Sequence, residues 1–190
     1  MANEVLSDAA SEFEDRLRAT GREGVEALIA WLEGSDFFQA PASTRWHGAH
    51  EGGLVEHSLA VCDRLLQLDA GLGFGLAKES MALCALLHDV CKADCYVRDF
   101  RNVKDERGQW HRVPCYKFEE KFPFGGHGSK SVYLVQHFVE LSPEEAAAIN
   151  CHMGQFDATS YSNPSPVYAA NPLAWLLHVA DEAATYVDEK

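Results

Sequence analysis

Met81-Ala-Leu-Cys-Ala-Leu-Leu-His88-Asp89-Val-Cys-Lys92 sets a histidine beside a carboxylate at the end of an otherwise apolar helical run. Removing both polar side chains from water is costly unless a partner such as a metal ion compensates for it. Four more residues of metal-binding type lie far apart along the chain: His57, His127, His152 and Asp181. If all six side chains converge, they form a pocket rich in nitrogen and oxygen that is large enough for two divalent metals. This pattern is typical of a hydrolase.

Helical periodicity extends over most of the chain. Residues 3–33 read as helical, with one buried face, and Gly34 and Ser35 are expected to end that helix. Ser142 is expected to cap another helix, with Pro143 in its first position. The apolar residues of the first face are Val25, Leu28, Ile29 and Leu32. The remaining helices are predicted over residues 54–68, 76–91, 128–140, 143–153 and 172–187.

Residues 94–124 break this helical pattern. They contain strand-like runs on either side of a turn signal at Arg107-Gly108, and so predict a β-hairpin insertion. The predicted fold class is therefore all-α with a β-hairpin insertion near residues 94–124. The hairpin could cover the site as a lid, or it could be a structural element or a contact between copies in a homo-oligomer. Its candidate lid residues are Tyr96, Arg98, Arg101, Trp110 and Tyr116.

Composition restricts the class of protein. A chain of 190 residues is most economically one domain with a substantial core. It contains no apolar run of 18 residues and no visible signal peptide, so a cytoplasmic protein without a membrane span is expected. Its six cysteines fit free thiols in a reducing compartment. The net charge of −13 disfavours tight binding of long nucleic acid and leaves a small phosphorylated partner open, because bound metals reverse the field locally.

Three segments resemble the HD-domain superfamily of metal-dependent phosphohydrolases. The stretch that ends in Gly-Gly-Leu-Val-Glu-His57 is similar to the first histidine motif of HD-domain 3′–5′ exoribonucleases. The stretch Leu-Leu-His88-Asp89-Val-Cys-Lys is similar to the His-Asp motif, although Cys91 stands where the family has glycine. The stretch His-Val-Ala-Asp181-Glu resembles the closing aspartate segment. The resemblance covers roughly residues 45–187.

The resemblance implies an HD-domain helical bundle that forms a single domain over residues 1–190. Residues 1–44 would be an N-terminal helical extension and 45–187 the metal-site core. The family's dinuclear members imply two ligand sets that share Asp89. The first metal would be held by His57, His88, Asp89 and Asp181, and the second by Asp89, His127 and His152. The expected cofactor is one or two divalent ions of Mn, Fe, Co, Ni or Zn, because His and Asp accept several first-row metals.

Basic residues near these motifs are candidate phosphate contacts. Lys92 lies one helical turn after His88, so it is expected to act beside the metals and to pair with a substrate phosphate. Arg45 and Lys130 are further candidates for binding substrate. His47 and His50, in a glycine-rich segment, could also face the pocket.

The substrate is not determined by these motifs. The first hypothesis is hydrolysis of a phosphoester of a nucleotide or of a short or cyclic oligonucleotide by metal-activated water, with Asp89 and Lys92 as the catalytic residues. A 3′–5′ exoribonuclease is a second hypothesis. A catalytically silent module that binds metal or nucleotide is a third. Oxygen chemistry at a di-iron centre also stays open, because related folds perform it with similar ligands.

Overall fold

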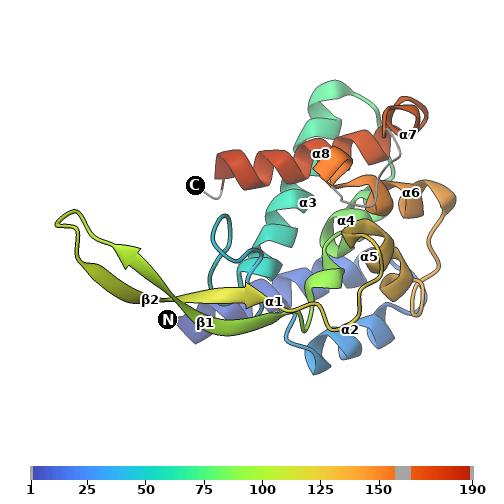
Figure 1. The fold of residues 1–190 in the computed structure, drawn as a ribbon. Helices are drawn as coiled ribbons and strands as arrows, with labels where there is room; N and C mark the ends of the chain where they lie inside the picture. Colours follow the sequence, from blue (N-terminus) through green and yellow to red (C-terminus); the bar gives the residue numbers. More distant parts are fainter. Residues whose placement is uncertain (1, 157–163, 189–190) are drawn as a thin grey trace.

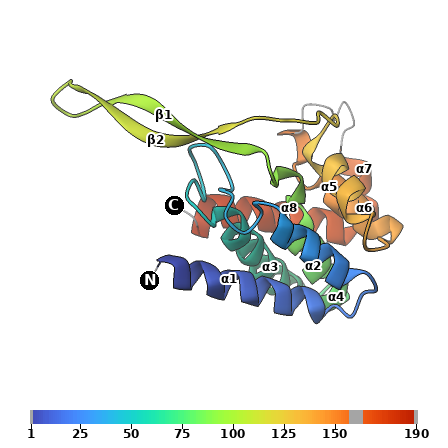
Figure 2. The same ribbon diagram turned by 90° about the horizontal axis from the view of Figure 1, so that it is seen from below.

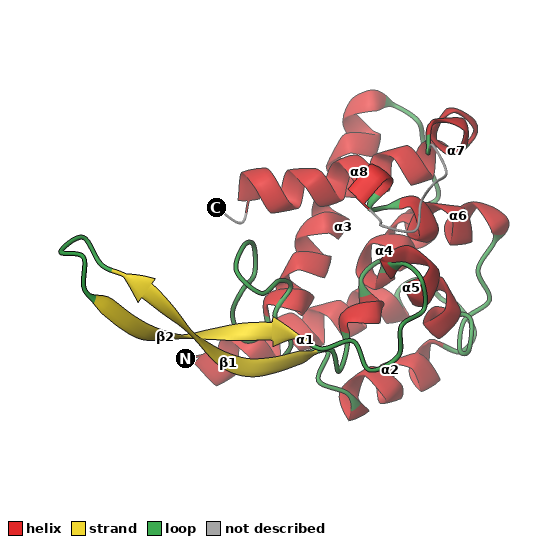
Figure 3. Cartoon of the chain, viewed as in Figure 1, coloured by secondary structure: helices red, strands yellow, loops and turns green. Residues whose placement is uncertain are grey.

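The structure is a computed structural model, and it describes residues 2–156 and 164–188. It is a helical bundle from which one two-stranded hairpin projects, so the predicted fold class is confirmed (Figures 1 and 3). The helices are α1 (Ala2–Arg18), α2 (Val25–Gly34), α3 (Gly53–Leu72), α4 (Lys78–Leu87), α5 (His127–Val135), α6 (Pro143–Cys151), α7 (Ser165–Ala170) and α8 (Pro172–Ala183). The strands are β1 (Tyr96–Lys104) and β2 (Trp110–Phe118).

Helix α3 lies at the centre of the bundle. It packs against α1, α4 and α8, and α6 packs against both α5 and α8. Figure 2 shows α1 and α2 along one side of α3 and the pair α5–α6 at the end away from the hairpin. Leu54 and Leu65 of α3, Leu86 of α4 and Leu177 of α8 are fully buried. This core fixes α3, α4 and α8 relative to one another, and these helices carry or precede four of the six candidate ligands.

The single helix expected over residues 3–33 is wrong. The chain leaves α1 after Arg18 and begins α2 at Val25, with Gly21 at φ 65° and Gly24 at φ 87° between them. Such backbone angles favour glycine. A Cβ atom on Gly24 would lie 1.8 Å from the carbonyl oxygen of Phe138. The break therefore separates α1 from α2 at the point where Gly24 passes close to the backbone of Phe138, just after α5.

Several helix ends also differ from the predicted ranges. Helix α3 continues to Leu72 and ends at Gly73, whose φ is 73°. Helix α4 stops at Leu87, four residues early, and a 3₁₀ turn over Val90–Lys92 follows. Helix α5 ends at Val135, and α8 changes to a π-helical turn at Ala184–Asp188. The short helix α7 was not predicted. Helix ends depend on tertiary contacts as well as on periodicity, which accounts for shifts of this size.

The hairpin agrees with its prediction. Its strands pair antiparallel from Tyr96 opposite Phe118 to Lys104 opposite Trp110, and Gly108 takes a positive φ in the turn. The ribbon projects away from the helices (Figures 1 and 2), and Trp110 is 67% exposed. Among the described residues it contacts the body near its root, where the Tyr96 hydroxyl donates to the Ala42 carbonyl at 3.1 Å and Arg98 pairs with Glu51 at 2.8 Å. The distal half of the hairpin therefore does not cover the bundle as a lid.

All six cysteines are free thiols, and four of them are buried. In the described part of the chain, the helices are too short or too polar to cross a membrane.

Helix α6 begins with the cap that the sequence predicts. The Ser142 side chain accepts from the backbone N–H of Glu145, and the Glu145 carboxylate accepts from the backbone N–H of Ser142 at 2.8 Å. Glu145 is also buried, and it accepts from the Ser80 hydroxyl at 2.7 Å and from Arg22. Burial alone would raise the pKa of Glu145, but these hydrogen bonds and the Arg22 charge lower it below its usual value.

We expect Glu145→Gln to lower the free energy of unfolding by about 1–3 kcal/mol at pH 7, because a charged hydrogen-bonded group is lost. A carboxylate with a lowered pKa stabilises the fold above its unfolded-state pKa and loses this effect as pH falls through its folded-state pKa. The difference between wild type and variant should therefore shrink toward zero under acid conditions. Urea unfolding between pH 3 and pH 7 measures it. The control is Glu144→Gln, an exposed neighbour; an equal loss there would contradict the prediction.

Candidate metal centre

The six predicted ligands come from five places in the bundle. Most of these side chains stand at or near the end of a helix. His57 lies on α3 and Asp181 on α8, His88 and Asp89 directly follow α4, His127 begins α5, and His152 directly follows α6. Contacts of α3 with α4 and α8, and of α6 with α5 and α8, bring these helix ends together.

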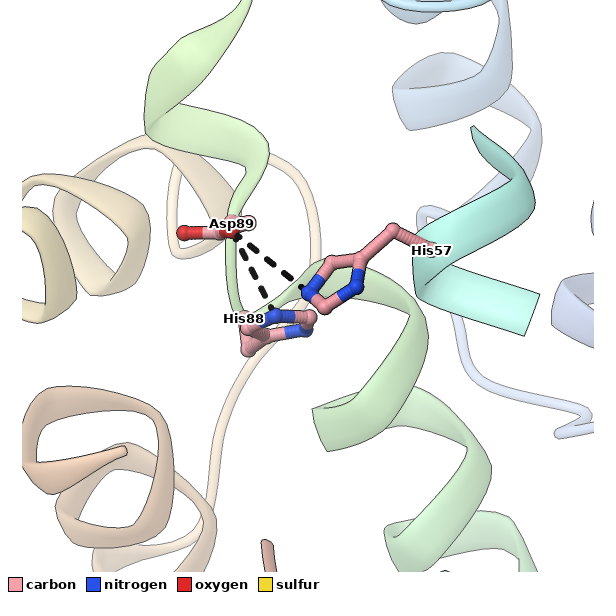
Figure 4. Close-up of side chains that lie close together, drawn as sticks. All are labelled: His57, His88 and Asp89. Carbon is pink, nitrogen blue, oxygen red and sulfur yellow. Dashed lines mark ion pairs between the residues drawn. The ribbon is translucent and has the colours of Figure 1, made fainter. Parts of the chain in front are cut away.

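His57, His88 and Asp89 form the first group of ligand atoms. Figure 4 shows both imidazole rings directed toward the Asp89 carboxylate. Asp89 Oδ2 lies 3.5 Å from His88 Nε2 and 4.0 Å from His57 Nε2. Asp181 joins from α8, because its Oδ1 lies 3.2 Å from His57 Nε2. The three ligand atoms of this first group all lie within 4.8 Å of one another, which is a spacing that one metal ion can bridge.

The second oxygen of Asp89 faces a different histidine. Asp89 Oδ1 lies 3.5 Å from His152 Nε2, and the rings of His88 and His152 are 4.9 Å apart. His127 belongs to a further group with Asp89 and Cys91, again within 4.8 Å. The two carboxylate oxygens of Asp89 thus face different histidines, and the ligand atom of His152 also lies within 4.8 Å of those of His88 and Asp181. This is the arrangement that a bridging carboxylate needs.

Two neighbouring residues can serve one centre here because the helix ends between them. His88 still has helical angles, with φ −57° and ψ −36°, whereas Asp89 has φ −108° and ψ 16°. On a continuous helix, adjacent side chains point about 100° apart. The early end of α4 removes that restriction, so both side chains reach the same pocket.

Backbone carbonyls orient two of the histidines. His88 Nδ1 lies 2.7 Å from the Ala85 carbonyl, and His152 Nδ1 lies 2.7 Å from the Ile149 carbonyl. A carbonyl only accepts, so each Nδ1 carries a proton and each ring turns its Nε2 toward the pocket. This use of the distal nitrogen is the usual way in which proteins fix a histidine ligand.

Buried polar atoms in the cluster fit a bound cation. Nε2 of His88, Nε2 of His152 and Oδ1 of Asp89 are buried and make no hydrogen bond with the residues that the structure describes. Leaving such atoms unsatisfied costs about 1–3 kcal/mol each. All three are lone-pair donors directed at shared space, so a divalent metal would satisfy them together. The donor set of imidazole and carboxylate suits Mn, Fe, Co, Ni or Zn.

The charge states of His88, Asp89 and Asp181 are those that metal binding requires, whereas the Asp89 carboxylate raises the pKa of His152 against the effect of burial. Burial lowers the pKa of His88 to about 4, which outweighs the opposing effect of Asp89. Burial alone would raise the pKa of Asp89, but Lys92, His88 and His152 hold it well below its usual value. The pKa of Asp181 is lowered in the same way, mainly by its hydrogen bond with His57, against the effect of burial. Both carboxylates are therefore ionised and His88 is neutral at pH 7.

Lys92 lies against the bridging carboxylate. Its Nζ is 2.5 Å from Asp89 Oδ2 and donates to the Ala42 carbonyl at 2.8 Å, and the side chain is buried. The charge of Asp89 raises the pKa of Lys92 despite burial, which alone would lower it. This contact makes Lys92 a positioning residue for Asp89. A direct contact with substrate phosphate remains a prediction.

The other predicted substrate contacts are placed differently. Lys130 is buried and forms an ion pair with Glu120, at 2.8 Å from its Oε1. Arg45 is exposed on the loop between α2 and α3. On the same loop, the His47 ring lies 5.0 Å from the His57 ring, whereas His50 is exposed and bonded to Glu56.

Cys91 is a member of the cluster that the sequence did not predict. Cys91 stands where the family has glycine, and its sulfur lies with the ligand atoms of Asp89 and His127. Burial raises the pKa of its thiol to about 12, so the group is neutral rather than a thiolate. Its position two residues after Asp89 was the available signal.

Comparison with known proteins gives two findings. A model of the HD domain matches residues 54–186, which is more than half of the chain. The dihydroneopterin 2′,3′-cyclic phosphate phosphodiesterase of Methanocaldococcus jannaschii is 38% identical over 155 residues, which cover 80% of this chain and 53% of that protein. The chain thus spans about half the length of this relative. No solved structure matches.

Proposed function

The chain belongs to the HD domain family, and we propose that it is a metal-dependent phosphohydrolase that cleaves a phosphodiester of a small substrate. The observation that carries this proposal is the pair of Asp89 oxygens, which face His57 and His88 on one side and His152 on the other. A shared carboxylate between two imidazole groups is suited to two metal ions at close range, and such pairs serve phosphoester hydrolysis.

The proposed ligand sets are His57, His88, Asp89 and Asp181 for one ion, and Asp89, His127 and His152 for the other. When bound, the ions would lower the pKa of a water molecule and stabilise negative charge on the phosphoryl oxygens. The protein's own part is to hold the ligands in place. Ala85 and Ile149 fix the His88 and His152 rings, and Lys92 holds Asp89 ionised and in position.

We propose that the substrate is a cyclic phosphodiester. The relative from Methanocaldococcus jannaschii is named for a 2′,3′-cyclic phosphate. A cyclic phosphodiester is also among the substrates of the first hypothesis, which names a nucleotide or a short or cyclic oligonucleotide. In such a reaction water forms a new P–O bond, one P–O bond of the ring breaks, and the leaving oxygen takes a proton. The product is a phosphomonoester. The net charge of −13 further favours a small substrate over long RNA.

Metal removal tests this proposal. We expect chelation followed by dialysis to abolish hydrolysis of 2′,3′-cyclic GMP and 2′,3′-cyclic AMP, because the ligand atoms alone supply no nucleophile. Adding back Mn, Fe(II), Co, Ni or Zn one at a time should restore product formation with at least one ion. Phosphorus NMR measures the product, and elemental analysis measures bound metal.

Two outcomes would contradict the proposal. One is full activity in protein shown to be free of metal. The other is a lack of activity toward both cyclic phosphates with all five ions. A linear oligoribonucleotide included in the same assay tests the exoribonuclease hypothesis, which stepwise release of mononucleotides would support in place of the cyclic-phosphate proposal.

A further inference from the structure

A cavity of about 300 Å³ adjoins the metal cluster on the α5 side. It reaches the cluster through His127 and Cys91, which both lie with Asp89 in one group of ligand atoms. A larger cavity of about 780 Å³ lies elsewhere, between Arg22 and Pro143, and shares no residue with the cluster. The smaller cavity is therefore the one in which the remainder of a substrate can lie while its phosphate faces Asp89.

The walls of this cavity suit a flat ring. Its apolar lining includes Phe118, Phe124, Met153 and Phe156. Phe124 is 37% exposed and Phe156 is 72% exposed, so their faces are accessible. The Phe118 ring stacks on the His127 ring, with centroids 6.2 Å apart. The aromatic lining of the cavity therefore extends to the metal cluster, of which His127 is a member. A volume of this size suits one bicyclic heterocycle. Stacking favours flat rings without distinguishing among them.

A charged pair at the cavity can distinguish them. Lys130 Nζ lies 2.8 Å from Glu120 Oε1 and 3.0 Å from Glu120 Oε2, and the backbone N–H of Phe122 donates to Oε1 at 2.9 Å. These bonds fix the carboxylate in one orientation. A carboxylate oxygen accepts two hydrogen bonds, so Oε2 retains a lone pair. The polar group offered to a ligand is thus a rigid acceptor.

We propose that this cavity binds the heterocycle of the substrate and that Glu120 Oε2 accepts one hydrogen bond from a ring amino group. The inference rests on the proposed function, because the phosphate is placed at the metal cluster. The ring class that fits is a 2-amino-4-oxopyrimidine ring fused to a second ring, which guanine and pterins share. Its 2-amino group supplies the donor for Glu120 Oε2. Hypoxanthine and adenine both lack an amino group at that position.

Three cyclic nucleotides that differ only in this edge test the proposal. With metal-loaded protein, we expect kcat/KM for 2′,3′-cyclic GMP to exceed that for 2′,3′-cyclic IMP and 2′,3′-cyclic AMP by about tenfold or more, as expected for a charged hydrogen bond. In Glu120→Gln this preference should fall to about twofold or less. The matched control is Glu119→Gln, the same change on an exposed neighbour that pairs with Lys117, and it should keep the preference.

The two proposals fail in different ways. If wild type hydrolyses all three nucleotides at equal kcat/KM, or if Glu120→Gln keeps the preference, the cavity inference is overturned and the hydrolase stands. If wild type hydrolyses none, the proposed function fails. Calorimetric binding of GMP, IMP and AMP to the metal-loaded protein then still tests the cavity: tighter binding of GMP that Glu120→Gln removes supports it, and equal binding overturns it.

A second variant guards against misfolding of Glu120→Gln. Phe156→Ala removes an exposed ring, so the fold should persist, and circular dichroism checks this. We expect KM to rise severalfold for all three nucleotides while the preference for guanine is unchanged, because stacking is lost and the acceptor is retained. An unchanged KM for all three would count against the cavity as the binding site.

Discussion

Replacing Asp89 by asparagine is expected to lower kcat/KM for phosphodiester hydrolysis by about a thousandfold or more and to reduce the metal bound per chain. Asparagine keeps the size of the side chain but offers one neutral oxygen where the carboxylate offers two charged ones. Both proposed metals lose a ligand in this variant. A loss of about 4 kcal/mol of transition-state stabilisation corresponds to a thousandfold in rate. Steady-state kinetics and elemental analysis of the purified variant measure the two effects.

The matched control is Asp69→Asn. Asp69 is also a buried aspartate, but it lies on α3 and accepts from the backbone N–H of Leu76 at 3.1 Å, outside the cluster. The asparagine oxygen can accept the same bond, so stability, metal content and rate should stay near those of wild type. An Asp89→Asn protein that is folded, binds two metals and turns over normally would exclude Asp89 as the bridge.

Replacing Gly24 by alanine is expected to lower the free energy of unfolding by about 2–4 kcal/mol, which combines backbone strain with overpacking. Its φ of 87° disfavours a side chain, and the added Cβ would meet the Phe138 carbonyl oxygen. The clash is with backbone atoms, so it is relieved only if α2 and the segment after α5 move apart. Urea unfolding monitored by circular dichroism measures the change.

Gly21→Ala separates the two causes. Gly21 has a similar φ of 65°, but a Cβ there meets nothing within 4 Å. We expect a loss of about 1 kcal/mol, from backbone strain alone. Equal losses in the two variants would show that the close approach to Phe138 is unimportant for stability.

The sequence was sufficient to predict which side chains gather at the centre. Their types, and the family motifs around His57, His88 and Asp181, indicated a shared pocket before any geometry was known. The fold class and the hairpin followed from the change between helical and strand periodicity. These features depend on local residue patterns, which a single sequence shows directly.

Features that depend on tertiary contact could not be predicted. The close approach of Gly24 to Phe138 joins segments more than a hundred residues apart, so the break between α1 and α2 read as continuous helix. Lys130 is a candidate for binding substrate from the sequence, but its ion pair with Glu120, ten residues earlier, was not predicted. Periodicity carries no information about such pairs.

The root of the hairpin has a consequence for how this chain can change over evolutionary time. The backbone N–H of Glu119 donates to the Cys95 carbonyl at 2.7 Å, and beyond this bond the strands run as an exposed ladder to the turn at Gly108. If one residue is removed from or added to each strand at paired positions, Cys95 and Glu119 at the root keep their places. The ribbon is therefore a tolerant insertion point, where lineages can vary length or graft a peptide without moving Asp89 or His127.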